Sequence, residues 1–229
     1  MDNQYSNSHS NDRFSITPSG FFGSSPDMIQ ARENFMTKEE HEFLLNAAKN
    51  LTHWDVTETH YNEDGTVIYD SEYWKDRVAT TPSLDKEDPE IARVILGLVK
   101  RLKVEVDEFF NVDALPTSPA IVKWLPGQLQ MPHADKELHE GPDAGTPNSF
   151  PWYDIGTVFY INDDYQGGEL YFPKQGIEFK PKARAGYFFP GDLNYIHGVR
   201  PITSGCRYTS PYFWTIDVLP EKFNGPKDF

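Results

Sequence analysis

The feature that most constrains the fold is a series of short β-type runs after residue 119, with no helical pattern between them. Pro-Gly and Gly-Gly turns separate these runs, which cover 120–125, 155–161, 168–172, 177–180, 185–189, 193–197 and 207–216. Closely spaced strands without intervening helices predict a β-sandwich or a barrel. We therefore expect a mostly β fold in this part of the chain.

Two helices are predicted before the strands. Thr37 and Glu40 form a capping-box pattern at the start of the first helix, and Asp88 followed by Pro89 predicts the start of the second. Apolar residues recur at helical spacing after both caps, at Phe43, Leu44, Ala47, Ala48 and Leu51, and at Ile91, Val94, Ile95, Leu98, Leu102 and Phe109. Between the helices, Asp-Gly at 64–65 predicts a hairpin.

Length and composition favour one domain with a flexible arm. The 229 residues are 38% hydrophobic, which is enough for a single core over residues 26–229. Residues 1–25 are rich in Asn, Ser, Asp and Gly, so we expect a flexible N-terminal arm. The net charge of −14 disfavours nucleic acid and anionic membranes as partners. It is compatible with a basic protein substrate or simply with a hydrated surface.

The expected location is cytoplasmic. Cys206 is the single cysteine, so no disulfide can form within the chain. The first residues contain no apolar run typical of a signal peptide, and no later stretch approaches the roughly 20 apolar residues needed to cross a bilayer. The sequence leaves the oligomeric state open.

Three residues form a candidate metal site. His133 and Asp135 are two apart, so both side chains point to one face of an extended strand, and His197 ends the β-type run 193–197. Two histidines and one carboxylate are the facial ligand set of non-haem iron(II). An accidental His-x-Asp pair is the alternative interpretation.

Arg207 strengthens the metal hypothesis. It begins an apolar, aromatic strand, where a cation without an anionic partner would be costly. A guanidinium binds a carboxylate bidentately, so Arg207 predicts an acidic ligand unless it is an ordinary surface arginine.

Five segments around these residues resemble one family. They are WLPGQLQMPHAD (124–135), VFYIN (158–162), GGELYFP (167–173), GYFFPG (186–191) and HGVRPITSGCRY (197–208). In sequence and in order, these segments resemble those of the 2-oxoglutarate and iron(II)-dependent dioxygenases, in particular the prolyl 4-hydroxylase-like branch. The resemblance extends over residues 35–216. Two departures concern Gln130, where many prolyl hydroxylases have tyrosine, and Arg207, which is lysine in collagen-type members.

The resemblance implies a double-stranded β-helix, or jelly roll, with N-terminal helices packed on the major sheet and a catalytic core at about 118–217. Fe(II) would be bound by His133, Asp135 and His197. The co-substrate 2-oxoglutarate would be bound by Arg207, Tyr160 and Thr209. Dioxygen would be the second co-substrate, with ascorbate as reductant.

The activity implied is hydroxylation of a C–H bond, with succinate and carbon dioxide as products. The preferred substrate is a prolyl residue in a peptide or protein, and a free amino acid or other small molecule is the alternative. A third possibility is a catalytically silent metal-dependent sensor. Substrate contacts are predicted from segments 57–80 and 136–154, the second interpreted as a hinged lid, and from Trp124, Gln130, Trp152 and Trp214.

Overall fold

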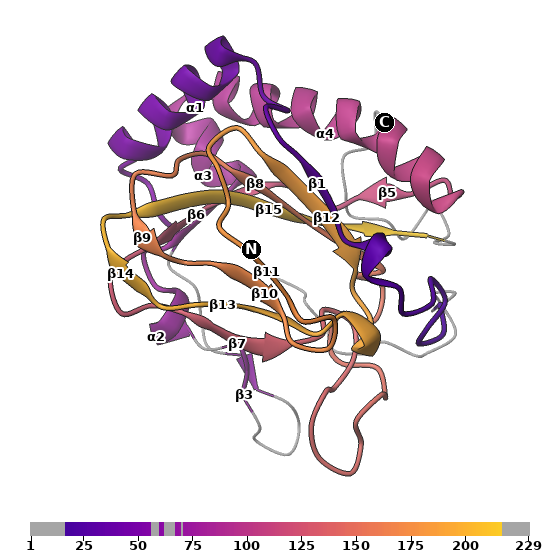
Figure 1. Ribbon diagram of the computed structural model, residues 1–229. Helices are drawn as coiled ribbons and strands as arrows, with labels where there is room; N and C mark the ends of the chain where they lie inside the picture. The colour runs from indigo at the N-terminus through magenta and orange to yellow at the C-terminus, as the bar shows by residue number, and fades with distance from the viewer. Residues whose placement is uncertain (1–16, 56–59, 62–66, 70, 217–229) are drawn as a thin grey trace, which may run out of the picture.

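Antiparallel sheets dominate the computed structural model, which describes residues 17–55, 60–61, 67–69 and 71–216 (Figure 1). The larger sheet has the strand order β1–β12–β8–β15–β6–β4, and β5 pairs with β15. Its strands are β1 (Gln30–Arg32), β4 (Val78–Thr80), β5 (Leu115–Pro116), β6 (Ala120–Trp124), β8 (Ile155–Tyr160), β12 (Gly186–Pro190) and β15 (Arg207–Thr215). The predicted mostly β architecture is confirmed.

The smaller sheet contains four strands and lies below the larger one in Figure 1. Its order is β11 (Ile177–Phe179), β10 (Leu170–Phe172), β13 (His197–Val199) and β7 (Gln130–His133). Two further pairs join β14 (Ile202–Ser204) to β9 (Gln166–Gly167) and β2 (His60–Tyr61) to β3 (Val67–Tyr69). The last pair confirms the predicted hairpin, although its Asp-Gly turn lies outside the described residues.

The strand predicted at 193–197 is wrong. Leu193–Tyr195 forms a 3₁₀ turn, η2, because the Asp192 side chain accepts a hydrogen bond from the Asn194 amide at 2.8 Å. Strand β13 begins only at His197.

Both predicted helix starts are confirmed. Helix α1 (Lys38–Asn50) has the complete Thr37–Glu40 capping box, and α4 (Pro89–Phe110) begins after Asp88, which accepts from the Glu90 amide. Shorter helical segments are α2 (Ser71–Trp74), α3 (Thr81–Glu87) and the 3₁₀ turn η1 (Pro26–Met28). Within the described part of the chain, none of the helices has both the length and the apolarity to cross a membrane.

Alternation along the strands creates two apolar interiors. One face of β8, β12 and β15 packs with residues of α1 and α4, which lie over the larger sheet in Figure 1. That cluster includes Leu44, Ile95, Leu98, Ile155, Phe159, Phe188 and Trp214. The opposite face turns towards the smaller sheet and includes Val158, Tyr160, Leu170, Phe172 and Phe189. The space between the sheets is therefore separate from the core under the helices.

Residues 17–25 were predicted to belong to a flexible arm, and this is wrong for that stretch. The Thr17 side chain is buried and hydrogen-bonds to Asp154, and the Gly20 amide donates to Asp192 at 2.9 Å. Polar side chains can order a segment that has little apolar surface when their partners are buried and charged. The rest of the predicted arm, residues 1–16, lies outside the described residues.

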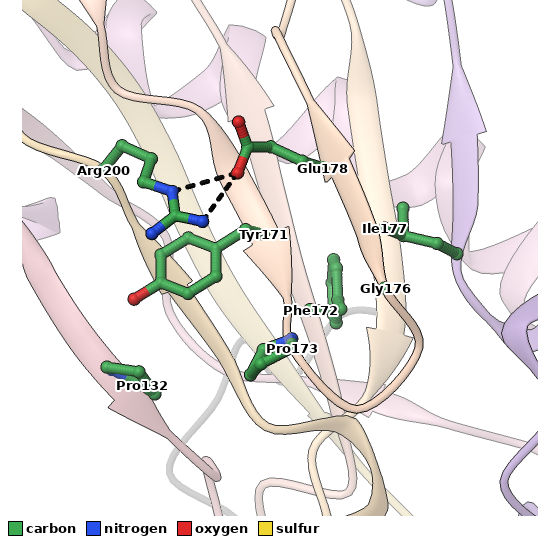
Figure 2. A pocket seen from close by; sticks show the side chains of 8 residues that line it. All are labelled: Pro132, Tyr171, Phe172, Pro173, Gly176, Ile177, Glu178 and Arg200. Carbon is green, nitrogen blue, oxygen red and sulfur yellow. Dashed lines mark hydrogen bonds and ion pairs between the residues drawn. The ribbon is translucent and has the colours of Figure 1, made fainter.

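A surface hollow of about 500 Å³ lies beside the smaller sheet (Figure 2). Arg200 crosses it, pairing with Glu178 at 2.9 Å and stacking over the Tyr171 ring at 3.8 Å. Pro132 lines the hollow, but the neighbouring His133 does not. This hollow is therefore distinct from the candidate metal site.

The helix–sheet core should dominate stability. Replacing Leu98 with Ala, at a fully buried position of α4, should lower the free energy of unfolding by about 2–5 kcal/mol through lost burial and an unfilled cavity. The matched control is Val104→Ala on the same helix, where the side chain is 58% exposed, and a change within about 0.5 kcal/mol is expected. Urea unfolding followed by circular dichroism measures both, and equal losses would contradict the assignment of the core.

Candidate functional site

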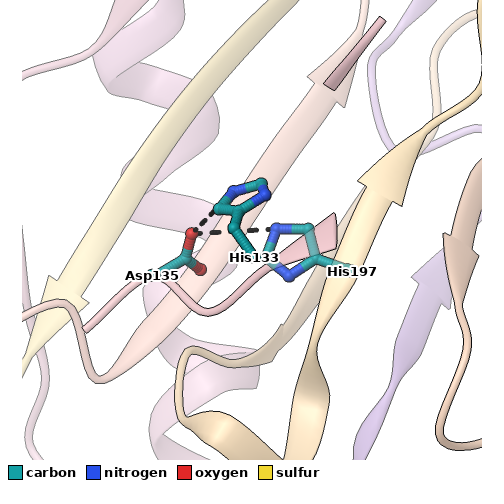
Figure 3. A group of neighbouring side chains, drawn as sticks. All are labelled: His133, Asp135 and His197. Carbon is teal, nitrogen blue, oxygen red and sulfur yellow. Dashed lines mark ion pairs between the residues drawn. The ribbon is translucent and has the colours of Figure 1, made fainter. Parts of the chain in front are cut away.

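His133, Asp135 and His197 come together in space, as predicted (Figure 3). One oxygen of Asp135 lies 3.6 Å from His133 Nε2 and 3.7 Å from His197 Nε2. Strand pairing explains the contact of the two imidazoles, because β13 and β7 are antiparallel with His197 directly opposite His133. One potential ligand atom from each residue lies within 4.8 Å of the others, close enough to surround a single ion.

Backbone carbonyls orient both imidazoles. His133 Nδ1 lies 2.9 Å from the Met131 carbonyl, and His197 Nδ1 lies 3.1 Å from the Tyr195 carbonyl. A carbonyl only accepts, so each Nδ1 carries a proton, and Nε2 of the neutral imidazole is the nitrogen left to bind a metal. Metal-bound histidines characteristically have this arrangement.

The Asp135 carboxylate is positioned by close backbone contacts. Its amide donates to the Gly191 carbonyl at 2.8 Å, while its side-chain Oδ2 is buried without a hydrogen-bond partner in the described structure. A Cβ at Gly156 would lie 2.6 Å from Oδ2, so only glycine leaves room for the carboxylate there. A buried carboxylate oxygen without a partner fits a site for a cation.

Electrostatics favour metal binding over protonation at His197. Burial lowers the pKa of His197 to about 4, although the Asp135 charge opposes this shift. Burial also lowers the pKa of His133, but hydrogen bonding and charge from Asp135 outweigh it and raise that pKa above its usual value. Near neutral pH, His197 is therefore in the neutral form that a metal requires.

Arg207 is the central residue of a second part of the site, and only 2% of its surface is exposed. One terminal nitrogen donates to the Tyr160 hydroxyl at 3.0 Å, whereas Nε and the other terminal nitrogen have no hydrogen-bond partner in the described part of the chain. No ion pair to Arg207 occurs among those residues either. A buried guanidinium with two unused donors fits an anionic ligand such as a carboxylate.

Trp124 and Thr209 form the wall behind this guanidinium. The Trp124 ring lies 4.9 Å from the Arg207 guanidinium carbon, and its indole donates to Thr209 Oγ1 at 3.2 Å. The Arg77 guanidinium carbon lies 4.7 Å from the centroid of the same ring. Trp124, which was predicted to touch the substrate, is buried and contacts both guanidinium groups.

Tyr165 was missed by the sequence analysis. Its hydroxyl is buried and without a hydrogen-bond partner in the described structure, and its ring packs beside Arg207 across Gly168. A Cβ on Gly168 would lie 3.0 Å from the Tyr165 ring and 3.3 Å from Arg207 Cδ. Burial raises the pKa of both Tyr160 and Tyr165, so both phenols remain protonated donors. The position of Tyr165, just before Gly-Gly, was the available signal.

Aromatic packing joins the two parts of the site. The Phe189 ring lies 4.5 Å from the His197 ring and 4.9 Å from Phe172, and both phenylalanines share a buried cluster with Tyr160. Val199, two residues after His197, packs with Trp124 and Tyr165. The three-residue cluster and Arg207 therefore face the same interior between the sheets.

Trp214 does not reach this interior. It is fully buried in the core below the helices and donates to Thr157 at 2.8 Å, so the predicted substrate contact is wrong. Successive strand residues point to opposite faces, and Arg207, Thr209 and Phe213 share the face that Trp214 does not. Phe213 pairs with Gly156, the residue packed against Asp135.

An aromatic stack extends from Phe213 into segment 136–154. The Tyr153 ring lies 3.9 Å from the Phe213 ring and 5.0 Å from Phe150, nearly parallel to both. Trp152 meets this stack edge-on, with its ring 6.1 Å from that of Tyr153. Gln130 lies on β7 opposite Val199. The stack thus joins segment 136–154 to Phe213, and the pairing of Phe213 with Gly156 relates it to Asp135.

The base of segment 136–154 is closed by a buried ion pair. Lys136 and Asp154 are both almost fully buried, with Nζ and Oδ1 2.5 Å apart. The pair fixes the two ends of the segment. The hinged lid stays a prediction for the residues between them.

No family model matches this chain, but it is similar to several known hydroxylases. It is 30% identical to human prolyl 3-hydroxylase 2 over 96 residues, which are 38% of this chain and 13% of that protein. It is 25% identical over 142 residues to a PKHD-type hydroxylase of Klebsiella pneumoniae, covering 60% of each. The chain thus spans less than two thirds of the length of these relatives.

Solved structures share the fold. A viral collagen prolyl hydroxylase from Paramecium bursaria Chlorella virus-1, in complex with 2-oxoglutarate, aligns with a TM-score of 0.55 and 16% identity over 84% of this chain and 98% of its own. A Trichoplax adhaerens prolyl hydroxylase bound to a peptide fragment of hypoxia-inducible factor also gives 0.55, with 16% identity and 84% of each chain covered.

Relatives, fold and site all point to the oxygenases that depend on 2-oxoglutarate and iron(II), and the resemblance seen in the sequence is confirmed. The relatives and solved structures named above are prolyl hydroxylases or PKHD-type hydroxylases, so the chain resembles the prolyl hydroxylase-like branch. The cluster of His133, Asp135 and His197 fits the iron that these oxygenases use.

Close packing at Gly156 gives a test of the cluster. Gly156→Ala should weaken Co(II) binding by about tenfold or more, because the added methyl group would collide with Asp135 Oδ2 and with the Phe189 ring. Gly97→Ala is the matched control, since a Cβ on Gly97 of α4 would meet nothing within 4 Å. Visible-absorbance titration with Co(II) measures both, and unchanged affinity in Gly156→Ala would contradict the placement of Asp135.

Proposed function

We propose that this protein is a 2-oxoglutarate- and dioxygen-dependent iron(II) hydroxylase that acts on a prolyl residue of a peptide or protein. One observation carries the proposal: the metal-binding cluster and a buried Arg207 without an acidic partner among the described residues face the same interior. A metal site alone would fit many reactions. Its combination with a carboxylate site fits an acidic co-substrate.

In this proposal, Nε2 of His133 and of His197 and the Asp135 carboxylate hold the iron. Fixed tautomers and a buried carboxylate keep all three ligands ready without rearrangement. Bound iron with 2-oxoglutarate and dioxygen would supply the oxidant for an unactivated C–H bond, with succinate and carbon dioxide as products. The antiparallel sheets that carry these ligands support a double-stranded β-helix.

The distal carboxylate of 2-oxoglutarate would be bound by Arg207. Two of its nitrogens are unused, and Tyr160 and Tyr165 add two phenol donors beside it. Trp124 excludes water from one side of the guanidinium and holds the Thr209 hydroxyl. In such a dry pocket, hydrogen bonds to a charged ligand are stronger than in water.

The aromatic stack supports a prolyl substrate. Phe213 and Tyr153 offer flat aromatic rings, and Phe213 pairs with Gly156, which packs against Asp135. A pyrrolidine ring can pack against such faces. Trp152 and Gln130 are further candidates for contacts with the peptide, by their position on the segment and on β7. The charge of −14 supports a basic sequence around the target residue.

A free amino acid would need a second cationic site for its own carboxylate, and three candidate cations for it have other partners. Arg77 contacts the Tyr73, Trp74 and Trp124 rings and donates to two carbonyls. Lys123 lies over Trp54, and Arg184 donates to the Met36 carbonyl. An internal residue of a peptide has no free α-carboxylate and needs no such site, so a peptide is the better substrate.

The direct test incubates the protein with iron(II), 2-oxoglutarate, dioxygen, ascorbate and a panel of basic proline-containing peptides. Peptide-dependent formation of succinate together with an added oxygen atom in the peptide, seen by mass spectrometry, is expected. Both should disappear in Asp135→Ala. Succinate formation without any hydroxylated peptide, but stimulated by free amino acids, would favour the small-molecule alternative. No turnover at all would favour a silent sensor.

Arg207 should control the affinity for the co-substrate. Arg207→Gln should weaken 2-oxoglutarate binding by about 10–100-fold, because about 1.5–3 kcal/mol of charge-assisted hydrogen bonding is lost. Arg200→Gln is the matched control, since Arg200 pairs with Glu178 at the outer hollow. Isothermal titration of the Mn(II) form measures both, and equal affinities would exclude Arg207 from the pocket.

Phe213 should affect the substrate rather than the co-substrate. Phe213→Ala should reduce peptide-stimulated succinate formation about tenfold or more through loss of a ring contact, while 2-oxoglutarate affinity stays within about twofold. Phe109→Ala, a partly exposed position on α4, should change neither. Steady-state kinetics with varied peptide distinguishes the two, and an unaffected Phe213→Ala enzyme would remove the stack from the substrate site.

A further inference from the structure

Residues 17–25 contact two chain segments next to predicted metal ligands: the residues that follow Asp135 and the turn η2 that precedes His197. The stretch runs beside η2 in Figure 1, and His197 follows η2 after one residue, Ile196. It also reaches the residues that directly follow Asp135. None of these nine residues is needed to explain the iron or co-substrate contacts.

On the Asp135 side, the contacts are buried and charged. Lys136 Nζ donates to the Thr17 carbonyl at 2.8 Å and to the Thr17 hydroxyl at 2.5 Å, and that hydroxyl also contacts Asp154. Ser19 donates to the Glu137 carboxylate at 3.1 Å. Lys136 and Glu137 are the two residues after Asp135. These hydrogen bonds therefore limit movement of the backbone that carries Asp135.

On the His197 side, the contacts surround η2. The Gly20 amide donates to Asp192 at 2.9 Å, and Asn194 donates to the Gly23 carbonyl at 3.1 Å. The Tyr195 hydroxyl donates to the Ser25 carbonyl at 3.1 Å. The Tyr195 carbonyl in turn accepts from His197 Nδ1, so this turn directly sets the orientation of that imidazole.

We propose that residues 17–25 form a positioning strap that holds Asp135 and His197 at metal-binding distance. The inference rests on the proposed function only in requiring that these residues bind a metal. Glu137 shows how the two sides are joined, because one of its oxygens accepts from both Ser19 and the Leu193 amide of η2. The strap thus links the two ligand-bearing segments through the buried carboxylates of Glu137, Asp154 and Asp192.

The test compares metal affinity with stability in the full chain. The double variant Thr17→Val/Ser19→Ala removes two hydroxyls and leaves the Lys136–Asp154 pair in place. Its dissociation constant for Co(II) should rise about tenfold, which is typical for loss of groups that orient metal ligands. Thr17→Ser, which keeps the hydroxyl, should restore Thr17's part of the affinity.

The matched control is Thr81→Val, which removes a hydrogen bond to the Pro119 carbonyl on the helical side of the larger sheet. It should lower the thermal midpoint without changing Co(II) affinity. A folded double variant with Co(II) affinity within about twofold of the parent would overturn the proposal, whatever its thermal midpoint. If the double variant does not fold, Ser19→Ala alone is measured, with the same two outcomes. Since Co(II) binding requires no turnover, failure of the proposed hydroxylation would be seen separately.

Discussion

The pairing of β13 with β7 is the interaction on which the site depends. It places His197 directly opposite His133 in the smaller sheet, and neither imidazole could reach the other if the register moved by one residue. The third ligand comes from the turn after β7, where the Asp135 amide binds the Gly191 carbonyl at the end of β12. The cluster therefore also joins the smaller sheet to the larger one, and sheet closure and metal geometry are a single constraint.

Two cationic side chains, Lys136 and Arg207, are buried in this fold, and they differ in their partners. Lys136 has a carboxylate partner in Asp154, so its charge is neutralised within the fold. Arg207 has aromatic neighbours and a single hydrogen-bonded phenol, that of Tyr160, with no acidic partner among the described residues. Because an uncompensated buried charge is expensive, the first arrangement stabilises structure and the second favours binding of an anion. The difference lies in the partner, since both side chains are almost fully buried.

Much of the fold and site could be predicted from local patterns. Thr37, Glu40 and Asp88 define helix starts through hydrogen bonds within three residues, and the metal residues matched a family pattern. Failures arose where a distant contact decided the outcome. Thr17 is ordered by Lys136, more than a hundred residues away, and nothing in its own polar segment indicates this. Trp214 was a different failure, since counting by two from Arg207 reaches Phe213 and was sufficient to exclude it.

The buried pair of Lys136 and Asp154 separates the part of segment 136–154 next to the metal site from the part that is free to vary. Lys136 and Asp154 fix the two ends of segment 136–154 next to Asp135, and breaking a buried pair costs about 3–5 kcal/mol. Between them, Gly141 to Ala144 are exposed, so changes there disturb little packing. The aromatic residues lie at the fixed end, where Tyr153 precedes Asp154 and stacks on Phe213. If the protein acts as proposed, the fixed end keeps its contacts with the reacting residue. The sequence of the exposed tip is then free to differ between enzymes that act on different substrates.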